Sequence, residues 1–392
     1  MTQRRIAVVT TSRADYSHLY WPLRLLSEHP GVDLRVIAMA SHLSPEFGMT
    51  VREIEKDGFA LAARIESLLS SDSDVGMAKS IGTAVLSLAD ALGAMRPDLL
   101  LLIADRYEML APAAVALSLR IPIAHIEGGE ISEGAIDDAV RNALTKMSHV
   151  HFTSTETARA RVIAMGEEPW RVHRAGAPSL DHLRRSRLLD RREVEALCGL
   201  DLSTPPLLVA CHPVTLEPDT LAEPAALFEA LEQPAAGTPV VFCFPNADAG
   251  SRALIERTRD FLARHPEGRL FVNLDAVTYW SLLRCVDVMI GNSSSGIMET
   301  ASFALPTVNI GTRQRGRERA RNVLDAEANP ACILARVAKA RSPDFRASLA
   351  GMSNPYGDGH AAERIAEVLT SVPLGPALLI KRAGPISPEN PS

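Results

Sequence analysis

Polar and charged side chains follow several short apolar runs in this 392-residue chain. Ligands of open α/β sheets bind beyond the carboxyl ends of the strands, so residues that directly follow an apolar run are the first candidates for chemistry. The segments with this arrangement are TSRADY, ASHLSPEFG, ADRYE, HIEGGE, CHPVT and GNSSSG. Together they supply carboxylates, arginines, histidines and serines that one site could collect.

Four carboxylates in or just after these segments are candidates for acid–base catalysis: Asp105, Glu127, Glu130 and Asp137. Asp105 follows a leucine run, and the two glutamates lie in a glycine-bearing loop where backbone can approach a ligand closely. Clustered carboxylates raise one another's pKa, which suits a general base or acid near neutral pH. Taken singly, Asp105 could instead cap a helix. Arg141, four residues after Asp137, is either a substrate contact or that residue's solvated salt-bridge partner.

The segment GNSSSG is suited to an anion. Ser293, Ser294 and Ser295 stand between Asn292 and Gly296 at the expected start of a helix. Free backbone N–H groups and the helix dipole favour phosphate at such a position. An ordinary serine N-cap is the alternative, but it accounts for one serine and not for three.

Further polar residues could contact an anionic, hydroxyl-bearing substrate. Glu299, one helical turn after the serines, could accept hydrogen bonds from a ribose, although an exposed helix glutamate is the commonplace alternative. Five arginines fall within residues 313–321, and Arg313 and Arg317 could bind a diphosphate in fork geometry. A nucleic-acid patch is the rival interpretation, but no other basic stripe accompanies it. The remaining candidates, each after an expected strand and each open to a plain loop role, are Arg13, His42 and His212.

The elements that must position these residues follow from the spacing of the apolar runs. Short runs alternate with helix-length segments, which predicts an α/β protein with doubly wound parallel sheets. A glycine and proline break near residue 176 marks a domain crossing, giving domains at 1–176 and 177–356. We expect a further helix at 361–369 and a flexible tail at 373–392. Strands are expected at 6–10, 34–38, 99–103, 121–126 and 150–153, then at 206–211, 240–244, 270–273, 286–291 and 307–310.

Composition excludes several classes of protein. A formal net charge of −6 gives no global attraction to nucleic acid or to an anionic membrane. The five cysteines have no metal-ligand spacing, and we interpret them as reduced thiols. No run approaches the about 20 apolar residues of a membrane span, and no signal-peptide core is present, so we expect a cytoplasmic protein. Without a Walker, GxGxxG, GxSxG or HExxH motif, nothing demands a cofactor.

Taken in order, the segments resemble the UDP-N-acetylglucosamine 2-epimerases, and specifically the hydrolysing branch that serves sialic and legionaminic acid synthesis. The motifs that carry the resemblance are SRADY, SHLSPEFG, DRYE, HIEGGE, IDDAVRNALTKMSH, HPVT and GNSSSGIMETASFALPTVNIGTRQRGR. It implies the GT-B fold, with a sugar-side first domain, a nucleotide-side second domain and a central cleft. A C-terminal helix at about 357–372 would complete the first domain, and the protein would be a homo-oligomer, a dimer or tetramer.

The resemblance also implies the reaction and its residues. A nucleoside-diphosphate N-acetylglucosamine-type sugar, either UDP-GlcNAc or a UDP- or GDP-linked 2,4-diacetamido-trideoxy sugar, would pass through a 2-acetamidoglucal to the free manno sugar. Asp105, Glu127 and Asp137 match the acidic trio of the family. Arg13, His212, Ser294, Glu299 and Arg317 match nucleotide contacts. Two departures are Ala104, where the family usually has glycine, and Asp137, where non-hydrolysing relatives carry glutamate.

Three other functions compete with this one. A non-hydrolysing epimerase would add the diphosphate back, a GT-B glycosyltransferase would need one base and an acceptor groove, and a non-catalytic nucleotide-sugar-binding protein would have lost its carboxylates. The motif variants and the intact acidic trio favour the hydrolysing enzyme.

Overall fold

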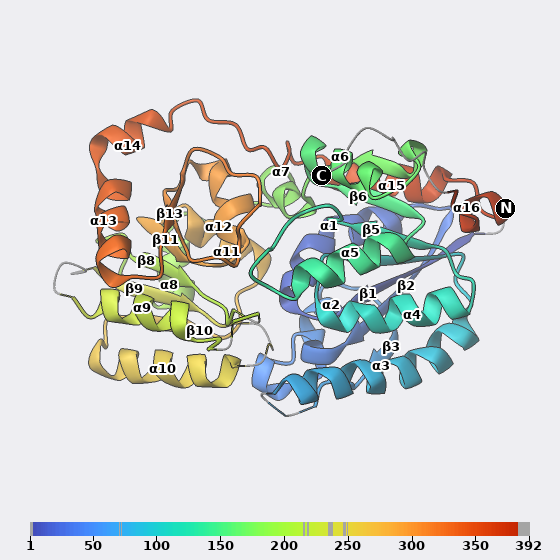
Figure 1. The fold of residues 1–392 in the computed structure, drawn as a ribbon, viewed down its shortest axis with the longest axis horizontal. Coiled ribbons are helices and arrows are strands. Elements are labelled where there is room, and N and C mark those ends of the chain that lie inside the picture. Colours follow the sequence, from blue (N-terminus) through green and yellow to red (C-terminus); the bar gives the residue numbers. More distant parts are fainter. Residues whose placement is uncertain are drawn as a thin grey trace, which may run out of the picture.

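Two parallel sheets, each packed between helices, lie side by side in the molecule (Figure 1). The computed structural model describes residues 3–382 apart from 70, 72, 215, 218, 234–237, 246, 247 and 249. The strand orders are β3-β2-β1-β4-β5-β6-β7 and β10-β9-β8-β11-β12-β13, and all pairs are parallel. In both sheets the order reverses next to the first strand, which is where doubly wound folds bind ligands.

The first domain forms its sheet from nearly continuous apolar runs, as strands covered on both faces require. Its strands are β1 (Arg4–Thr10), β2 (Val32–Met39), β3 (Leu61–Ile65), β4 (Leu99–Ile103), β5 (Ile123–Ile126), β6 (Val150–Thr153) and β7 (Val172–Arg174). Its helices are α1 (Arg13–Glu28), α2 (Val51–Lys56), α3 (Asp74–Met95), α4 (Leu110–Ser118), α5 (Asp137–Met147), α6 (Glu156–Ala164) and α7 (Asp181–Arg185).

The second domain repeats this architecture with two apolar clusters, one on each face of its sheet. Its strands are β8 (Leu207–Ala210), β9 (Val240–Cys243), β10 (Arg269–Phe271), β11 (Val288–Gly291), β12 (Thr307–Ile310) and β13 (Val323–Ala326). Its helices are α8 (Arg191–Cys198), α9 (Ala222–Leu231), α10 (Ser251–Arg264), α11 (Ala276–Leu283), α12 (Ser295–Met298), α13 (Pro330–Arg341) and α14 (Pro343–Ser348).

The chain passes between the domains twice at one place. The Ala177 amide donates to the Tyr356 carbonyl at 2.7 Å, so the outgoing and returning segments run against each other. Beyond this point α15 (Ala361–Ser371) packs on α1 and buries Ile365 and Leu369 in the first domain (Figure 1). Helix α15 therefore covers the first sheet.

The expected flexible tail at 373–392 is wrong for its first part. Helix α16 (Pro376–Leu379) lies on the first domain, with Leu378 1% exposed. Arg171 donates to the carbonyls of Ala377, Leu378 and Ile380 at 2.7 to 3.0 Å. A buried guanidinium needs such acceptors, and the tail supplies them. Residues 383–392 lie outside the described part of the chain.

Helix α3 is the one helix among the described residues that has the length and apolar composition of a membrane span, although the sequence analysis expected none. Ala84, Leu88 and Leu92 lie in the core of the first domain, but Leu86 is 74% exposed. The helix therefore covers one face of the sheet, and its outward face carries Leu86 together with the charged Lys79 and Asp90.

Candidate active site

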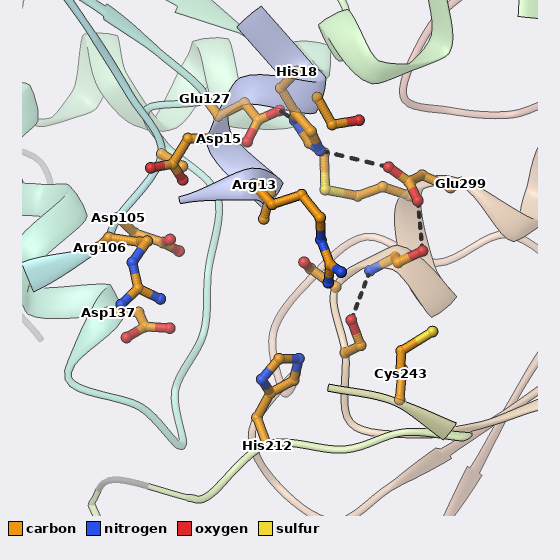
Figure 2. Close-up of a pocket in the computed structure, with 18 of the residues that line it drawn as sticks. Arg13, Asp15, His18, Asp105, Arg106, Glu127, Asp137, His212, Cys243 and Glu299 are labelled. Carbon is orange, nitrogen blue, oxygen red and sulfur yellow. Dashed lines mark hydrogen bonds and ion pairs between the residues drawn. The ribbon is translucent and has the colours of Figure 1, made fainter. Parts of the chain in front are cut away.

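A cavity of about 190 Å³ lies between the two domains, at the carboxyl ends of both sheets. Figure 2 shows Asp105, Arg106 and Asp137 on one side of it, Glu127 and His18 above, and Glu299 on the facing domain. Among the predicted residues, those that line this cavity are Arg13, Asp105, Glu127, Asp137, His212, Ser293, Ser294, Ser295, Glu299, Arg313 and Arg317. Parts of the chain far apart in sequence are thus brought to one place.

Local hydrogen bonds shape the turn that precedes α1. Ser12 caps the helix by accepting from the Asp15 amide, and Asp15 in turn accepts from the Thr11 amide at 3.0 Å. Arg13 is the first helical residue and reaches across the cleft, where it donates to the Val272 carbonyl of the second domain at 3.0 Å. The SRADY segment therefore functions as a capped turn that directs an arginine to the facing domain.

Asp105 is held by Arg141, which lies behind it. The guanidinium of Arg141 pairs with the Asp105 carboxylate and also donates to the Glu130 carbonyl at 2.9 Å and to the Ser132 hydroxyl at 3.0 Å. Arg141 is 1% exposed and does not line the cavity. The prediction that it contacts substrate is therefore wrong in this structure, because its donors are already taken by Asp105 and by the loop behind it.

Asp137 pairs across the cleft. Its carboxylate lies 3.0 Å from the Arg313 guanidinium of the second domain, so it does not form the i, i+4 pair with Arg141. Burial raises the pKa of Asp137, while Arg313 opposes that rise. Asp137 therefore retains a proton at higher pH than an exposed aspartate does.

Glu127 and Glu130 differ in whether they line the cavity and in the direction in which their pKa is shifted. Glu127 lines the cavity, and although burial alone would raise its pKa, His18 and Arg317 lower it below the usual value. Glu130 is 3% exposed, does not line the cavity and lies 3.7 Å from Arg317, and burial raises its pKa. Glu130 thus supports the loop behind the site and faces no substrate.

The helix that begins at the serine segment of the second domain is shorter than expected. Helix α12 has only four residues, after which the chain continues as a 3-10 turn. Ser295 is fixed by its neighbours, since its hydroxyl contacts Tyr279 and donates to Glu299 at 2.5 Å. Ser293 and Ser294 line the cavity with it, so the three hydroxyls stay beside Glu299 although the helix is short.

Three further predicted contacts have structural roles. His42 is fully buried, with one ring nitrogen 2.9 Å from the Thr10 hydroxyl and the other 2.6 Å from Thr50, because the 3-10 turn after β2 folds it into the first domain. Asn292 is also fully buried, and its carboxamide accepts from the His212 amide and donates to the His212 carbonyl. Gly296 packs against Thr307 and faces away from the cavity.

His212 is the predicted histidine that remains in the cavity. Burial and then the nearby Arg313 hold the pKa of its ring well below the usual value, so the ring is neutral. Asn292 fixes its backbone, and its Nδ1 has no partner among the described residues. A neutral ring held in this way is suited to hydrogen bonding with an oxygen-rich ligand.

Comparisons with known proteins show the family of this chain. Residues 24–370 match the family model described as UDP-N-acetylglucosamine 2-epimerase. The chain belongs to that family. A Legionella pneumophila protein named UDP-N,N'-diacetylbacillosamine 2-epimerase (hydrolyzing) is 36% identical over 381 residues, covering 96% of this chain and 98% of the relative. A Campylobacter jejuni GDP/UDP-N,N'-diacetylbacillosamine 2-epimerase (hydrolyzing) is 36% identical over 331 residues, covering 84% and 86%. The chain therefore falls in the hydrolysing branch of the epimerase family.

Solved epimerase structures share the fold of this chain. The UDP-GlcNAc 2-epimerase of Neisseria meningitidis, solved bound to UDP-GlcNAc, superposes with a TM-score of 0.76 at 17% identity, covering 93% of this chain and 99% of that one. The enzyme of Methanocaldococcus jannaschii in complex with UDP-GlcNAc and UDP gives 0.75 at 17%, with the same coverage. The GT-B arrangement implied by the resemblance is confirmed.

Ala104, where epimerases of this family usually have glycine, adopts a left-handed backbone with φ of 58°. Glycine tolerates that conformation without strain, and alanine does so at a cost. His125 holds the strained residue in place, since its Nε2 lies 2.8 Å from the Ala104 carbonyl. The alanine therefore keeps the turn that presents Asp105.

His18 and Arg106 are among the residues of this epimerase-family cleft that were missed from sequence. His18, in the second turn of α1, sits between Glu127 and Glu299 (Figure 2). Arg106 pairs with Glu108 at 2.8 Å and lies 3.6 Å from Asp248 of the second domain. Arg106 had a signal, because it directly follows Asp105 after a strand. His18 had none, because it lies five residues after Arg13 and therefore not on the same face of the helix by spacing.

Proposed function

We propose that this chain is a hydrolysing 2-epimerase that converts a nucleoside-diphosphate N,N'-diacetylbacillosamine and water into the free manno-configured sugar and nucleoside diphosphate. The observation that carries the proposal is the arrangement of the cavity. Asp105, Glu127 and Asp137 occupy the first domain's wall, and hydroxyls and arginines occupy the second domain's wall. Such a cavity has acid–base groups at one end and diphosphate-binding groups at the other.

The carboxylates divide into a base and an acid by environment. His18 and Arg317 oppose the effect of burial and lower the pKa of Glu127, so it is ionised and able to accept a proton. Burial raises the pKa of Asp137, so it is able to hold and donate one. Pairs of titratable groups whose pKa values are pushed apart in this way mark acid and base assignments.

The reaction proceeds in two balanced halves. Glu127 accepts the proton of sugar carbon 2, the electron pair of that C–H bond forms the C1=C2 double bond, and the nucleoside diphosphate leaves carbon 1 with its bonding pair. Asp137 then gives its proton to carbon 2 from the opposite face, while a water oxygen bonds carbon 1. The Asp137 carboxylate takes up the proton that the water loses, and the proton on Glu127 passes to the departed nucleoside diphosphate or to solvent, so both carboxyl groups return to their starting states. Asp105, fixed by Arg141, orients the sugar.

The nucleotide half is assigned to the second domain together with Arg13. Arg13 and Arg317 supply positive charge for the diphosphate, and the hydroxyls of Ser293 and Ser294 supply donors. Glu299 is suited to the ribose hydroxyls as an acceptor. His212, Arg313 and Ser295 complete this wall, and their positions support stabilisation of the departing diphosphate.

The sugar is proposed from the relatives. Both hydrolysing relatives at 36% identity are named for N,N'-diacetylbacillosamine, one with UDP and one with GDP or UDP. UDP-N-acetylglucosamine is the second candidate, because a Neisseria meningitidis protein named UDP-N-acetylglucosamine 2-epimerase is 30% identical over 328 residues. The two substrates differ at sugar carbons 4 and 6.

A single experiment in deuterium oxide tests the proposal. Purified protein is incubated with UDP- and GDP-linked N,N'-diacetylbacillosamine and with UDP-N-acetylglucosamine, and proton NMR follows each sugar. Free manno-configured sugar carrying deuterium at carbon 2 is the expected product. Free sugar of unchanged configuration, a manno sugar still linked to the diphosphate, or no turnover unless an acceptor is added would each overturn the proposal.

A pair of chains joined through α3 is proposed as the oligomer. Val75, Lys79, Gly82, Leu86 and Asp90 are all exposed on one face of this helix. In an antiparallel two-fold contact centred between Gly82 and Leu86, Lys79 of one copy lies opposite Asp90 of the other, and the apolar residues meet between them. The same surface of both copies is then self-complementary.

A cytoplasmic location is proposed as well. All five cysteines are free thiols, namely Cys198, Cys211, Cys243, Cys285 and Cys332. A reducing compartment keeps thiols in that state.

A further inference from the structure

His18 is the one described side chain whose ring joins a carboxylate of the first domain to a carboxylate of the second across the cavity. Its Nδ1 lies 2.8 Å from Glu127, and its Nε2 lies 3.5 Å from Glu299 (Figure 2). Its side chain is 19% exposed and lines the cavity. The imidazole therefore stands between the proposed base and the proposed ribose acceptor.

Both ring nitrogens of His18 need a hydrogen to bond two carboxylates at once. Burial alone would lower the pKa of His18, but Glu127 and Glu299 raise it to about 10. His182 of α7 is a titratable neighbour, and burial lowers the pKa of that ring to about 4, so it is neutral. His18 is thus a cation between two carboxyl groups.

We propose that His18 is a positioning residue that keeps Glu127 ionised as the base and links it to the nucleotide side of the cleft through Glu299. This inference rests on the proposed function for its role in the reaction. When the ribose of a nucleotide forms hydrogen bonds with Glu299, the imidazolium loses its contact with that carboxylate. It then contacts Glu127 and the incoming diphosphate. The state of the base thereby depends on occupancy of the other domain.

The acidic side of the rate profile tests this link. The rate kcat/KM falls as pH drops through the pKa of Glu127, because a protonated carboxylate cannot accept a proton. In His18→Gln the nearer of the two cations that lower the pKa of Glu127 is gone and Arg317 remains, so that limb moves to higher pH by roughly one unit or more. In His18→Lys the positive charge returns, and the limb moves back toward the wild-type position. Glu299→Gln removes one of the two carboxylates that raise the pKa of His18. The limb therefore shifts in the same direction as in His18→Gln, but by less.

A matched control lies outside the cleft. His265 contacts Glu232 at 3.3 Å on the surface of the second domain, so His265→Gln removes a similar histidine–glutamate contact and leaves the profile in place. A loss of kcat at every pH with an unmoved limb in His18→Gln would overturn the proposal and leave His18 as a packing residue. The proposal would also be overturned if the acidic limb of His18→Lys stayed at the position found for His18→Gln.

An NMR measurement separates this inference from the proposed function. In protein labelled with ¹⁵N-histidine, the His18 signals are those missing from His18→Gln. Both ring nitrogens are expected to stay protonated at pH 8, well above the ordinary titration range of histidine. A ring that loses its proton near pH 6.5 would contradict the link. This measurement needs no substrate, so a protein that turned over no nucleotide sugar would refute the function while His18 was still tested.

Discussion

At the scale of single residues, neighbouring carboxylates in this cavity differ because their partners differ. Asp137 faces an arginine of the other domain, Glu127 faces a histidine, and Asp105 faces an arginine of its own domain. Partner and burial lower the pKa of Glu127 and raise that of Asp137. A reaction that needs one base and one acid can use two carboxyl groups in this way.

Replacing the proposed acid tests that division. Asp137→Asn keeps the size of the side chain but can neither give nor take a proton, so kcat falls by about 10² to 10⁴. Binding of UDP, measured by calorimetry, stays nearly unchanged, because Arg13 and Arg317 remain in place. Equal loss of UDP binding and turnover would show instead that the residue holds the cleft together through Arg313.

Asp105→Asn is expected to behave differently. Turnover is lost, and the free energy of unfolding falls by about 2 kcal/mol, since the buried Arg141 loses its carboxyl partner. Urea unfolding measures the change, and Asp138→Asn serves as the control because its contact with Arg141 is longer, at 3.5 Å. An unchanged unfolding midpoint in Asp105→Asn would contradict the positioning role of Arg141.

Residues directly after a strand could be found from sequence, whereas others could not. Asp105 and Glu127 follow apolar runs, and parallel strands end at one edge, so their meeting was predictable. His42 follows a strand too, but Ala40 has a φ of 54° and turns the chain inward. His18 lies within a helix, so its role depended on which face of α1 meets the second domain. Pattern reasoning does not provide that information.

At the scale of elements, the central strands were predictable, and of the four edge strands only β10 was expected, at 270–273. The strands β4 and β8 are apolar throughout, and β1 is apolar from Ile6 to Val9, because helices cover both faces. Strands β3, β7 and β13 lie at the edges of their sheets, with fewer apolar residues and half-exposed faces. These segments become strands only through backbone hydrogen bonds to the neighbouring strand.

The C-terminal segment offers a test at this scale. Ending the chain after Gly375 removes the buried Leu378 and three carbonyl acceptors of Arg171, leaving a buried guanidinium poorly paired. The free energy of unfolding of the first domain is expected to fall by about 3 kcal/mol. A chain that ends after Arg382 is the control and should unfold like the full protein. Equal stability of both truncated chains would show that α16 does not stabilise the first domain.

At the scale of the whole molecule, two glycines allow the domains to meet. A Cβ on Gly134 would lie 2.8 Å from backbone atoms of Arg313, and one on Gly316 would lie 2.5 Å from Ile131. Loop 131–134 and segment 312–317 therefore interlock, and the Asp137–Arg313 pair depends on that closeness.

Gly134→Ala is expected to hold the domains apart. Because the clash is with backbone, no side chain can move away to relieve it, so KM rises and kcat falls together, and small-angle scattering gives a larger radius of gyration. Gly93→Ala in α3 is the control, since a Cβ there meets nothing within 4 Å. A compact Gly134→Ala protein with ordinary kinetics would show that this interlock does not govern closure.

The proposed pairing through α3 is tested by Leu86→Glu. A carboxylate at the centre of the two-fold contact meets its own copy, and like charges repel. Light scattering during size exclusion should then report single chains, whereas wild type gives at least a pair. Leu197→Glu is the control, because Leu197 is 64% exposed on α8, far along the chain from α3. A wild-type protein that elutes as a single chain would refute the pairing.

The polar contacts across the cleft also bear on how ligands enter and leave it. Asp137 already contacts Arg313, and His18 already contacts Glu299. An arriving nucleotide sugar therefore enters by exchange of partners, competing with the enzyme's own facing groups for each arginine and carboxylate it uses. The same competition works in reverse after the reaction, because every pair that re-forms helps to expel a product. Intramolecular displacement of this kind favours rapid release over tight retention.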